Sequence, residues 1–231
     1  MKKIVFLLLH FIVSGGLYAQ INMVSKKIFL DSLNRETTPD KYVYTRVITN
    51  YSQKSVRYVV TDFYKNGRKK MTGATLDRDI LKKDGEFVYY YNNGSKEWVI
   101  NYSDDHKIGK EFNWYDNKNI KSEKENFWNS KTKTSQTLIL NFWNKDKELT
   151  VSNGEGEYED TSEFITEKGA VKNGLKEGVW KGTDLLRKIS FIENYEKGVL
   201  ISGTSTDENN VKHSYSSISN RQVSKKPLSN H

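Results

Sequence analysis

The chain contains no cysteine among its 231 residues. This absence excludes disulfide bonds, thiolate metal sites and a lipid anchor on cysteine. Only two prolines occur, Pro39 and Pro227, so proline does not interrupt the strands that the remaining composition favours. Long apolar runs are also scarce, and the run at 4–13, of about ten residues, is too short to span a bilayer. We therefore expect no membrane-spanning segment.

Residues 1–19 have the order of a secretory signal peptide. Lys2 and Lys3 precede the apolar run, small residues at 14–16 end it, and Ala19 provides a small residue at the cleavage point. We predict that residues 1–19 are removed on export, so that the mature protein begins at Gln20. A short buried N-terminal helix is the alternative interpretation.

The basic excess lies near the two ends of the chain. Lys and Arg number 37 against 29 Asp and Glu, which gives a formal charge of +8. Lys2 and Lys3 belong to the predicted signal peptide, and 212–231 adds basic side chains but no acidic ones. The remaining body has mixed charge and no basic stripe, so we expect no nucleic-acid partner. The Ser- and Lys-rich range 212–231 predicts a disordered basic tail.

A repeated motif is the strongest signal in the sequence. Residues 85–94 align with residues 109–118 without a gap, so that Gly85 matches Gly109 and Asn93 matches Asn117. The matched aromatic residues are Tyr90 with Trp114 and Tyr91 with Tyr115. Partial copies occur at 63–67 and 173–180. Repeats of this length indicate that each unit is one supersecondary element, and the aromatic content of 13% favours strands.

Each unit of the repeat predicts a β-hairpin. Asn66-Gly67 and Asn93-Gly94 are typical two-residue turns, in which both residues have positive φ. Such a turn would place Phe87 opposite Ile100, Tyr89 opposite Trp98 and Tyr91 opposite Lys96 on one side of the sheet. Tyr90 would face Glu97 on the other side. Lys118 takes the place of glycine in the next unit, so we expect a turn there that is looser or of another type.

The sequence therefore predicts a mostly β fold: an elongated antiparallel sheet of β-hairpin repeats with little helix. Residues 20–211 form one repeat domain in this interpretation, with a division near 130–150 as the alternative. Residues 24–33 fit either a short helix or a strand, and the polar range 75–83 fits an insertion with one helical turn. Further strands are expected at 42–49, 56–64, 136–143, 188–194 and 198–203.

The repeat units, which combine a glycine, aromatic residues and an Asn-Gly turn, resemble the variant MORN repeats of the YwqK-like antitoxins. Longer stretches look like the N-terminal extension of TonB-family energy transducers, namely 27–33, 42–48, 62–67, 85–94, 173–182, 193–198 and 201–209. We expect the receptor-binding domain of those transducers to be lacking here. The resemblance implies a MORN-like repeat sheet in the envelope of a Gram-negative bacterium, in the periplasm or at the cell surface, without energy coupling.

Side chains suited to catalysis are few. His106, in the stretch 103–106, could act as a base, but a polar loop residue is the simpler interpretation. If 155–160 is a strand, Glu155, Glu157 and Glu159 share one side, which would suit a carboxylate-based hydrolase or a calcium site. An exposed strand face is the alternative that we favour. We predict no catalytic residue, no cofactor and no metal site.

The aromatic side of the hairpins is the remaining candidate for function. Tyr and Trp are enriched where binding energy concentrates, although most rings of a repeat sheet can instead form its core. We expect a non-enzymatic interaction module or scaffold that binds an envelope protein or a glycan. An accessory or truncated relative of a TonB-type transducer and a hydrolase are the alternatives. The candidate binding surface consists of Tyr90, Tyr91, Trp98, Trp114, Tyr115 and Trp180.

Overall fold

A computed structural model describes residues 25–52, 54–162 and 164–218. They form one antiparallel sheet of 16 strands, in which the strands pair in chain order. The mostly β fold of consecutive hairpins that the sequence predicts is thus confirmed. The strands are β1 (Lys26–Leu30), β2 (Tyr44–Ile48), β3 (Tyr58–Tyr64), β4 (Lys69–Thr75), β5 (Gly85–Tyr90), β6 (Lys96–Ser103), β7 (His106–Trp114), β8 (Ile120–Asn129), β9 (Thr134–Trp143), β10 (Leu149–Ser152), β11 (Glu155–Thr161), β12 (Ile165–Lys172), β13 (Leu175–Asp184), β14 (Ile189–Glu196), β15 (Val199–Asp207) and β16 (Lys212–Tyr215).

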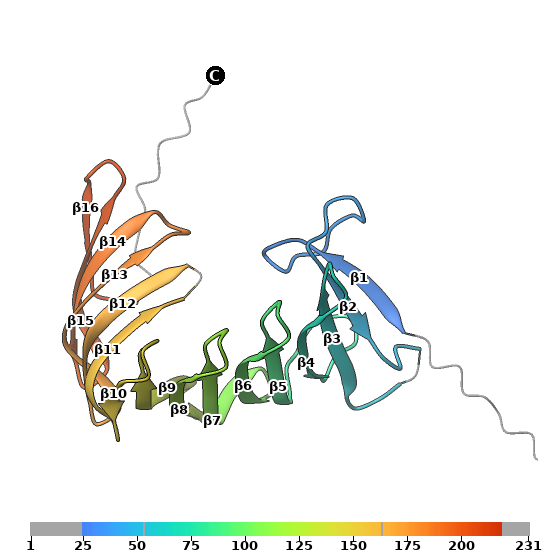
Figure 1. The fold of residues 1–231 in the computed structure, drawn as a ribbon, viewed down its shortest axis with the longest axis horizontal. Coiled ribbons are helices and arrows are strands. Elements are labelled where there is room, and N and C mark those ends of the chain that lie inside the picture. The colour runs from blue at the N-terminus through green and yellow to red at the C-terminus, as the bar shows by residue number, and fades with distance from the viewer. Residues whose placement is uncertain (1–24, 53, 163, 219–231) are drawn as a thin grey trace, which may run out of the picture.

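The sheet curves into a trough (Figure 1). Strands β5–β9 form its floor, while β1–β3 rise at one end and β11–β16 rise at the other. Because consecutive strands are antiparallel, the connections fall alternately on the two edges of the sheet. The first edge carries the β1–β2, β3–β4, β5–β6, β7–β8, β9–β10 and β11–β12 connections, and the second edge carries the others. The concave side is called the inner face.

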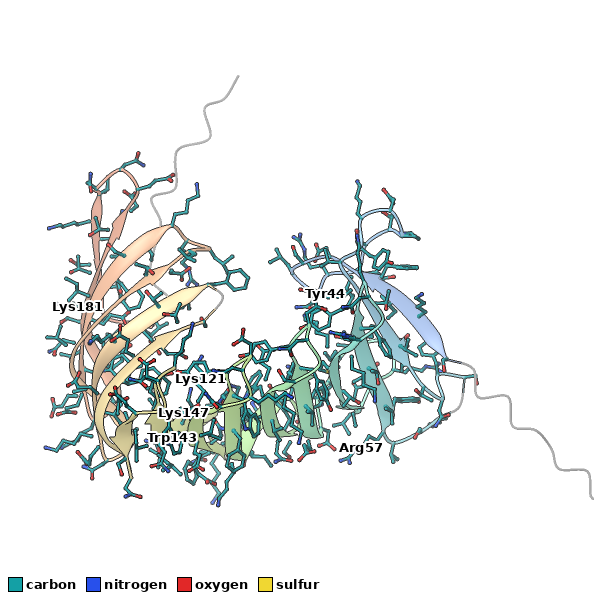
Figure 2. The ribbon with its side chains drawn as sticks, in the orientation of Figure 1. Tyr44, Arg57, Lys121, Trp143, Lys147 and Lys181 are labelled. Atoms are coloured by element: carbon teal, nitrogen blue, oxygen red, sulfur yellow. The ribbon has the colours of Figure 1, made fainter. Side chains whose placement is uncertain are left out.

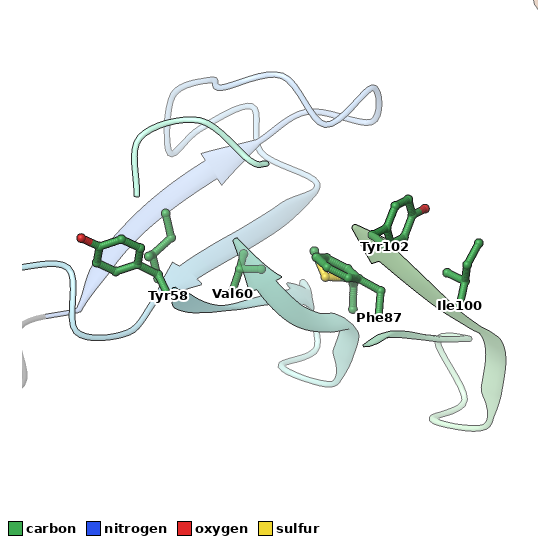
Figure 3. Packing of buried hydrophobic residues seen from close by; sticks show 7 residues of the cluster. Tyr58, Val60, Phe87, Ile100 and Tyr102 are labelled. Carbon is green, nitrogen blue, oxygen red and sulfur yellow. The ribbon is translucent and has the colours of Figure 1, made fainter. Parts of the chain in front are cut away.

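The hydrophobic core lies on the inner face. Cross-strand register places the buried apolar side chains on one side of the sheet, as Figure 3 shows for the first cluster. This first cluster consists of Ile48, Tyr58, Val60, Met71, Phe87, Ile100 and Tyr102. The second cluster consists of Ile139, Phe142, Val151, Tyr158, Val171, Trp180 and Tyr195. The outer face instead carries exposed apolar residues such as Val59, Val179 and Ile192.

Large rings of the inner face lie directly against glycines of neighbouring strands. A Cβ atom on Gly73 would stand 2.5 Å from the Phe87 ring, and one on Gly169 would stand 2.5 Å from the Trp180 ring. The same arrangement pairs Gly182 with Phe191 and Gly203 with Tyr215. Because glycine has no side chain, the ring can press against the backbone. Phe87 and Trp180 are fully buried as a result.

Buried acidic groups on the inner face have partners. Both carboxylate oxygens of Asp62 accept hydrogen bonds from the Arg46 guanidinium at 2.8 Å. Glu193, only 1% exposed, accepts hydrogen bonds from the Tyr195 hydroxyl at 2.9 Å and the Tyr215 hydroxyl at 2.8 Å. A buried carboxylate without such partners would be strongly destabilising. These bonds therefore allow acidic residues inside a one-sided core.

The hairpin turns of the first edge differ from the predicted geometry. Gly94 has a φ of +89°, and Asn93 is outside the positive-φ region. The Gly94 N–H donates to the Tyr91 carbonyl at 2.8 Å, and the Tyr91 N–H donates to the Ser95 carbonyl at 2.9 Å. This is a type I turn followed by a glycine bulge. The predicted pairing is confirmed for Phe87 with Ile100 and Tyr89 with Trp98. It is wrong for both Tyr90 and Tyr91, because a register shift after Tyr89 places Tyr90, and not Tyr91, opposite Lys96.

Two lysines take the place of glycine in equivalent turns. Lys118 and Lys147 have φ values of 71° and 69°. Their N–H groups donate to the carbonyls of Tyr115 and Asn144, in the same pattern as Gly94. The expectation of a looser turn at Lys118 is wrong, because the hairpin hydrogen bonds hold this residue in a conformation that costs roughly 1–2 kcal/mol.

Most of the other expected elements are present. All five additional strands form, and 24–33 contributes β1 rather than a helix. The range 75–83 has no helical turn and is closed by a bridge between Thr75 and Lys83. The sheet also continues through 130–150, although the two buried clusters lie on either side of its middle.

The expected disordered tail needs a correction at its start. Strand β16 lies inside the range 212–231 and pairs with β15. Its anchor is Tyr215, which covers Gly203 and is 8% exposed. One well-placed ring therefore adds a strand to the sheet despite the polar composition around it. Residues 219–231 and the predicted signal peptide, 1–19, lie outside the described residues.

The turn geometry gives a paired prediction. Gly94→Val places a β-branched residue at positive φ and should lower the free energy of unfolding by about 1–2 kcal/mol. Lys118→Gly removes a non-glycine residue from positive φ and should raise that free energy by up to about 1 kcal/mol. No atom lies within 4 Å of a Cβ on Gly94, so the first effect reports backbone strain. Urea denaturation measures both effects. Equal free energies of unfolding for the parent protein, Gly94→Val and Lys118→Gly would contradict the turn geometry.

Candidate functional site

The six aromatic residues predicted as one binding surface lie in different environments. Trp180 is fully buried in the second cluster, where its ring covers Gly169 and lies 5.6 Å from the Tyr158 ring. Its indole N–H donates to the Ala170 carbonyl at 3.0 Å. The prediction that Trp180 belongs to a binding surface is therefore wrong. The available sequence signal was Gly169 on the preceding strand, which leaves space for a large ring.

Tyr91 and Tyr115 belong to a ladder of hydrogen bonds along the first edge. Each tyrosine of the ladder opens a turn, and its hydroxyl donates to the carbonyl just before the next first-edge turn. The three bonds run from Tyr64 to Tyr90 at 2.7 Å, from Tyr91 to Trp114 at 2.8 Å, and from Tyr115 to Trp143 at 2.8 Å. They tie each hairpin to the next. Tyr115 is consequently 9% exposed, whereas Tyr91 is half-buried.

The remaining three predicted residues do not share one surface. Trp98 lies on the inner face, stacked 4.8 Å from Tyr89, with the Lys107 ammonium 4.5 Å from its ring. Trp114 alternates with Asn113 along β7, and its ring lies 6.2 Å from Phe112. Tyr90 follows Tyr89 and points to the opposite side of the sheet. The consecutive rings thus divide between the faces, as strand alternation requires.

A hollow of about 750 Å³ lies at the first edge of the trough, between its two raised ends. The β1–β2 connection lines one side with Ser32, Leu33 and Asn34. The β11–β12 connection lines the other side with Ser162 and Phe164. Segments far apart in the sequence therefore meet only because the sheet curves. Of the six predicted residues, Tyr91 and Trp114 line this hollow.

The N-terminal side of the hollow combines rings with polar groups. The Tyr44 and Tyr64 rings meet edge to face at 5.8 Å. The Lys70 ammonium lies 3.7 Å from the Tyr44 ring centre and donates to the Asn34 side-chain oxygen at 3.1 Å. Figure 2 shows Tyr44 on the inner side of this raised end. Sequence reasoning did not select Tyr44 or Tyr64, although Tyr64 precedes an Asn-Gly turn as Tyr91 does.

The C-terminal side of the hollow contains an ion pair between strands that are not neighbours. The ammonium of Lys121 on β8 lies 2.6 Å from the Asp160 carboxylate on β11. Both side chains are mostly buried, at 15% and 17% exposed, so solvent screens this pair less than a surface pair. The pair braces the curve of the sheet. Lys70 and Lys121 are matched in the lining by Glu97 and Asp160, so the lining carries balanced charge.

The acidic run 155–160 forms strand β11, as the sequence suggested. Glu155, Glu157 and Glu159 are exposed and alternate with the buried Tyr158. Glu159 pairs with Lys168 at 2.7 Å, and none of the three glutamates lines the hollow. This arrangement fits the exposed strand face that we favoured over a hydrolytic site.

His106 begins β7 after a tight turn at Asp104 and Asp105, both of which have positive φ. Its ring stacks on Trp128 with centroids 3.5 Å apart and an interplanar angle of 9°. The residue therefore has a packing role at the second edge of the sheet, whereas the hollow lies at the first edge.

The tyrosine ladder predicts a loss of stability at high pH. Burial raises the pKa of both Tyr91 and Tyr115 to about 12, and the carboxylate of Asp160 adds to the shift. A raised pKa means that the stabilisation is fully present below the ordinary value near 10 and is lost as the pH rises towards 12. Tyr91→Phe and Tyr115→Phe should each lower the free energy of unfolding by about 0.5–1.5 kcal/mol at neutral pH. Each should also reduce the decline between pH 10 and 12.

Urea denaturation across this pH range measures both effects. A variant that combines Tyr91→Phe and Tyr115→Phe provides the check. If it loses as much stability between pH 10 and 12 as the parent protein, the ladder tyrosines do not cause the loss.

Comparison with known proteins gives this chain no assignment. No protein-family model matches it, and no curated protein matches it significantly. Within the described ranges, no helix has the length and apolar character needed to cross a membrane. The same residues bring together no group of three or more His, Cys, Asp or Glu side chains that could hold a metal ion. The likeness to MORN-like repeats and to transducer extensions therefore stays an expectation from sequence.

Proposed function

We propose that the protein is a non-enzymatic binding module that holds a neutral glycan in the first-edge hollow. The observation that carries this proposal is the lining itself, where aromatic rings, side-chain amides, hydroxyls and balanced charges converge from both ends of the trough. The volume of about 750 Å³ lies within the range of small-molecule sites, roughly 300–1,000 Å³. A segment of a few sugar units fits such a space.

The chemistry of the lining matches that of a sugar. The apolar C–H face of a sugar ring packs on aromatic rings, and Tyr44, Tyr64 and Phe164 line the hollow. Sugar hydroxyls both donate and accept, and Asn34 and Asn92 offer amide groups that do the same. A lining with two lysines and two carboxylates has no net preference for an anion or a cation. These features together favour a neutral polyhydroxyl ligand over a charged peptide.

Two apolar side chains stand on opposite sides of the hollow. Leu33, 52% exposed, belongs to the β1–β2 connection, and Phe164, half-buried, belongs to the β11–β12 connection. Side chains in facing positions can contact both sides of one bound sugar. Binding of this kind leaves the ligand chemically unchanged, which agrees with a scaffold or capture role.

The proposed setting is the envelope of a Gram-negative bacterium, in the periplasm or at the cell surface. The signal-like segment 1–19 supports export, and the likeness to transducer extensions supports an envelope role. A mature chain that begins at Gln20 is part of the proposal, and the intact mass of envelope material checks it. Participation as an accessory to a separate TonB-type protein is compatible with glycan capture.

A glycan array with the mature protein tests the function. We expect retention on at least one class of neutral oligosaccharide, with affinity then measured by calorimetry. Phe164→Ala should weaken that affinity by about tenfold, because truncation of an anchoring aromatic side chain typically costs more than 1 kcal/mol. Phe127→Ala is the matched control, since Phe127 is 49% exposed and lies outside the hollow.

Circular dichroism and thermal unfolding of both variants show that the fold is retained. The proposal fails if no neutral glycan is retained. It also fails if Phe164→Ala binds the glycan as tightly as the control Phe127→Ala and the parent protein do.

A further inference from the structure

A second hollow, of about 620 Å³, lies on the inner face of the C-terminal half at the second edge. Its lining includes Lys124 from β8, Ser135 and Gln136 from β9, and Lys176 from β13. The β14–β15 turn contributes Lys197. No residue is shared between this lining and that of the first-edge hollow. The two spaces are therefore separate sites on one face.

The second hollow is basic, unlike the first. Three lysines line it, and the only carboxylate in the lining is that of Glu167. Glu167 is already engaged, because its carboxylate lies 2.5 Å from the Lys176 ammonium. Among the described residues, neither Lys124 nor Lys197 has an ion-pair partner within 4.0 Å. Two of the three ammonium groups thus remain available to an anion.

The carboxylate that faces Lys124 across the β7–β8 pair is held by other groups. Glu111 stands opposite Lys124 in the β7–β8 register. The Glu111 carboxylate accepts a hydrogen bond from Asn126 at 3.0 Å and lies 3.6 Å from the Lys107 ammonium. Lys107 is therefore the closer cation to Glu111.

The position of Lys176 is fixed by its surroundings. Its ammonium lies 4.1 Å from the Trp180 ring centre and 5.2 Å from the Tyr195 ring centre. A cation held over aromatic rings in this way is pre-organised and loses little freedom when an anion arrives. On the facing side, the hydroxyl of Ser135 and the amide of Gln136 supply neutral donors and acceptors.

We propose that this second hollow binds a small anionic saccharide, a sugar that carries a carboxylate or a phosphate. The ammonium groups of Lys124 and Lys197 pair with the anionic group, since charge-assisted hydrogen bonds are the stronger ones, while Lys176 stays paired with Glu167. The polar segment of β9 pairs with the sugar hydroxyls. The volume accommodates one or two sugar units.

Calorimetry with defined probes tests the site. Digalacturonate and glucose 6-phosphate distinguish a carboxylate from a phosphate source, and inorganic phosphate and lactose test the anion and the sugar alone. We expect an acidic sugar to bind more tightly than either inorganic phosphate or lactose, and to weaken as salt is raised. Lys124→Met and Lys197→Met should each reduce affinity about tenfold, the equivalent of one charged hydrogen bond.

The matched control is Lys181→Met. Lys181 lies on the outer face of β13, as Figure 2 shows, and does not line the second hollow. The Lys181→Met variant should therefore bind the probes as the parent protein does. Binding of lactose as tight as that of both acidic sugars would overturn the proposal, as would equal binding by inorganic phosphate alone. Full affinity in Lys124→Met and Lys197→Met would also overturn it. Because Phe164 is outside this lining, Phe164→Ala should retain acidic-sugar binding, which separates this site from the neutral-glycan site.

Discussion

A sheet of 16 strands without a covering layer must build its core on one of its own faces, and the structure depends on how it does so. The solution is a close fit between large rings and glycines on adjacent strands. Where glycine leaves space, a ring packs directly against the neighbouring strand and is buried from water. The four pairs are Gly73 with Phe87, Gly169 with Trp180, Gly182 with Phe191, and Gly203 with Tyr215.

This one-sided packing also explains where binding can occur. The inner face is crowded, and curvature towards it brings the two ends of the sheet together at the first edge, where the Lys121–Asp160 pair braces them. The tyrosine ladder fixes the spacing of the first-edge turns. The outer face stays open to solvent and holds no comparable convergence of side chains from distant strands in the described ranges. The first-edge and second-edge hollows therefore both lie on the inner face, the first with balanced charge and the second with basic charge.

The hairpins could be predicted from the sequence, but the curvature of the sheet into a trough could not. Alternation and the Asn-Gly turns predicted the strands and the pairing of Phe87 with Ile100, because these features are local. The turn type was wrong because Asn-Gly suits both a two-residue turn and a glycine bulge, and only hydrogen bonds beyond the dipeptide decide between them. The prediction for Trp180 was wrong because its burial depends on Gly169, which lies on another strand, and the local sequence around Trp180 does not show that contact. The hollow depends on curvature accumulated over many strands, which no single segment of the sequence encodes.

The most direct test of the one-sided core is the free energy of unfolding of Gly169→Ala. The added Cβ would stand 2.5 Å from carbon atoms of the Trp180 ring, which is fully buried. Overpacking of this kind should lower the free energy of unfolding by about 1–3 kcal/mol in urea denaturation. An unfolding midpoint equal to that of the parent protein would contradict the claim that ring-on-glycine packing replaces a second layer.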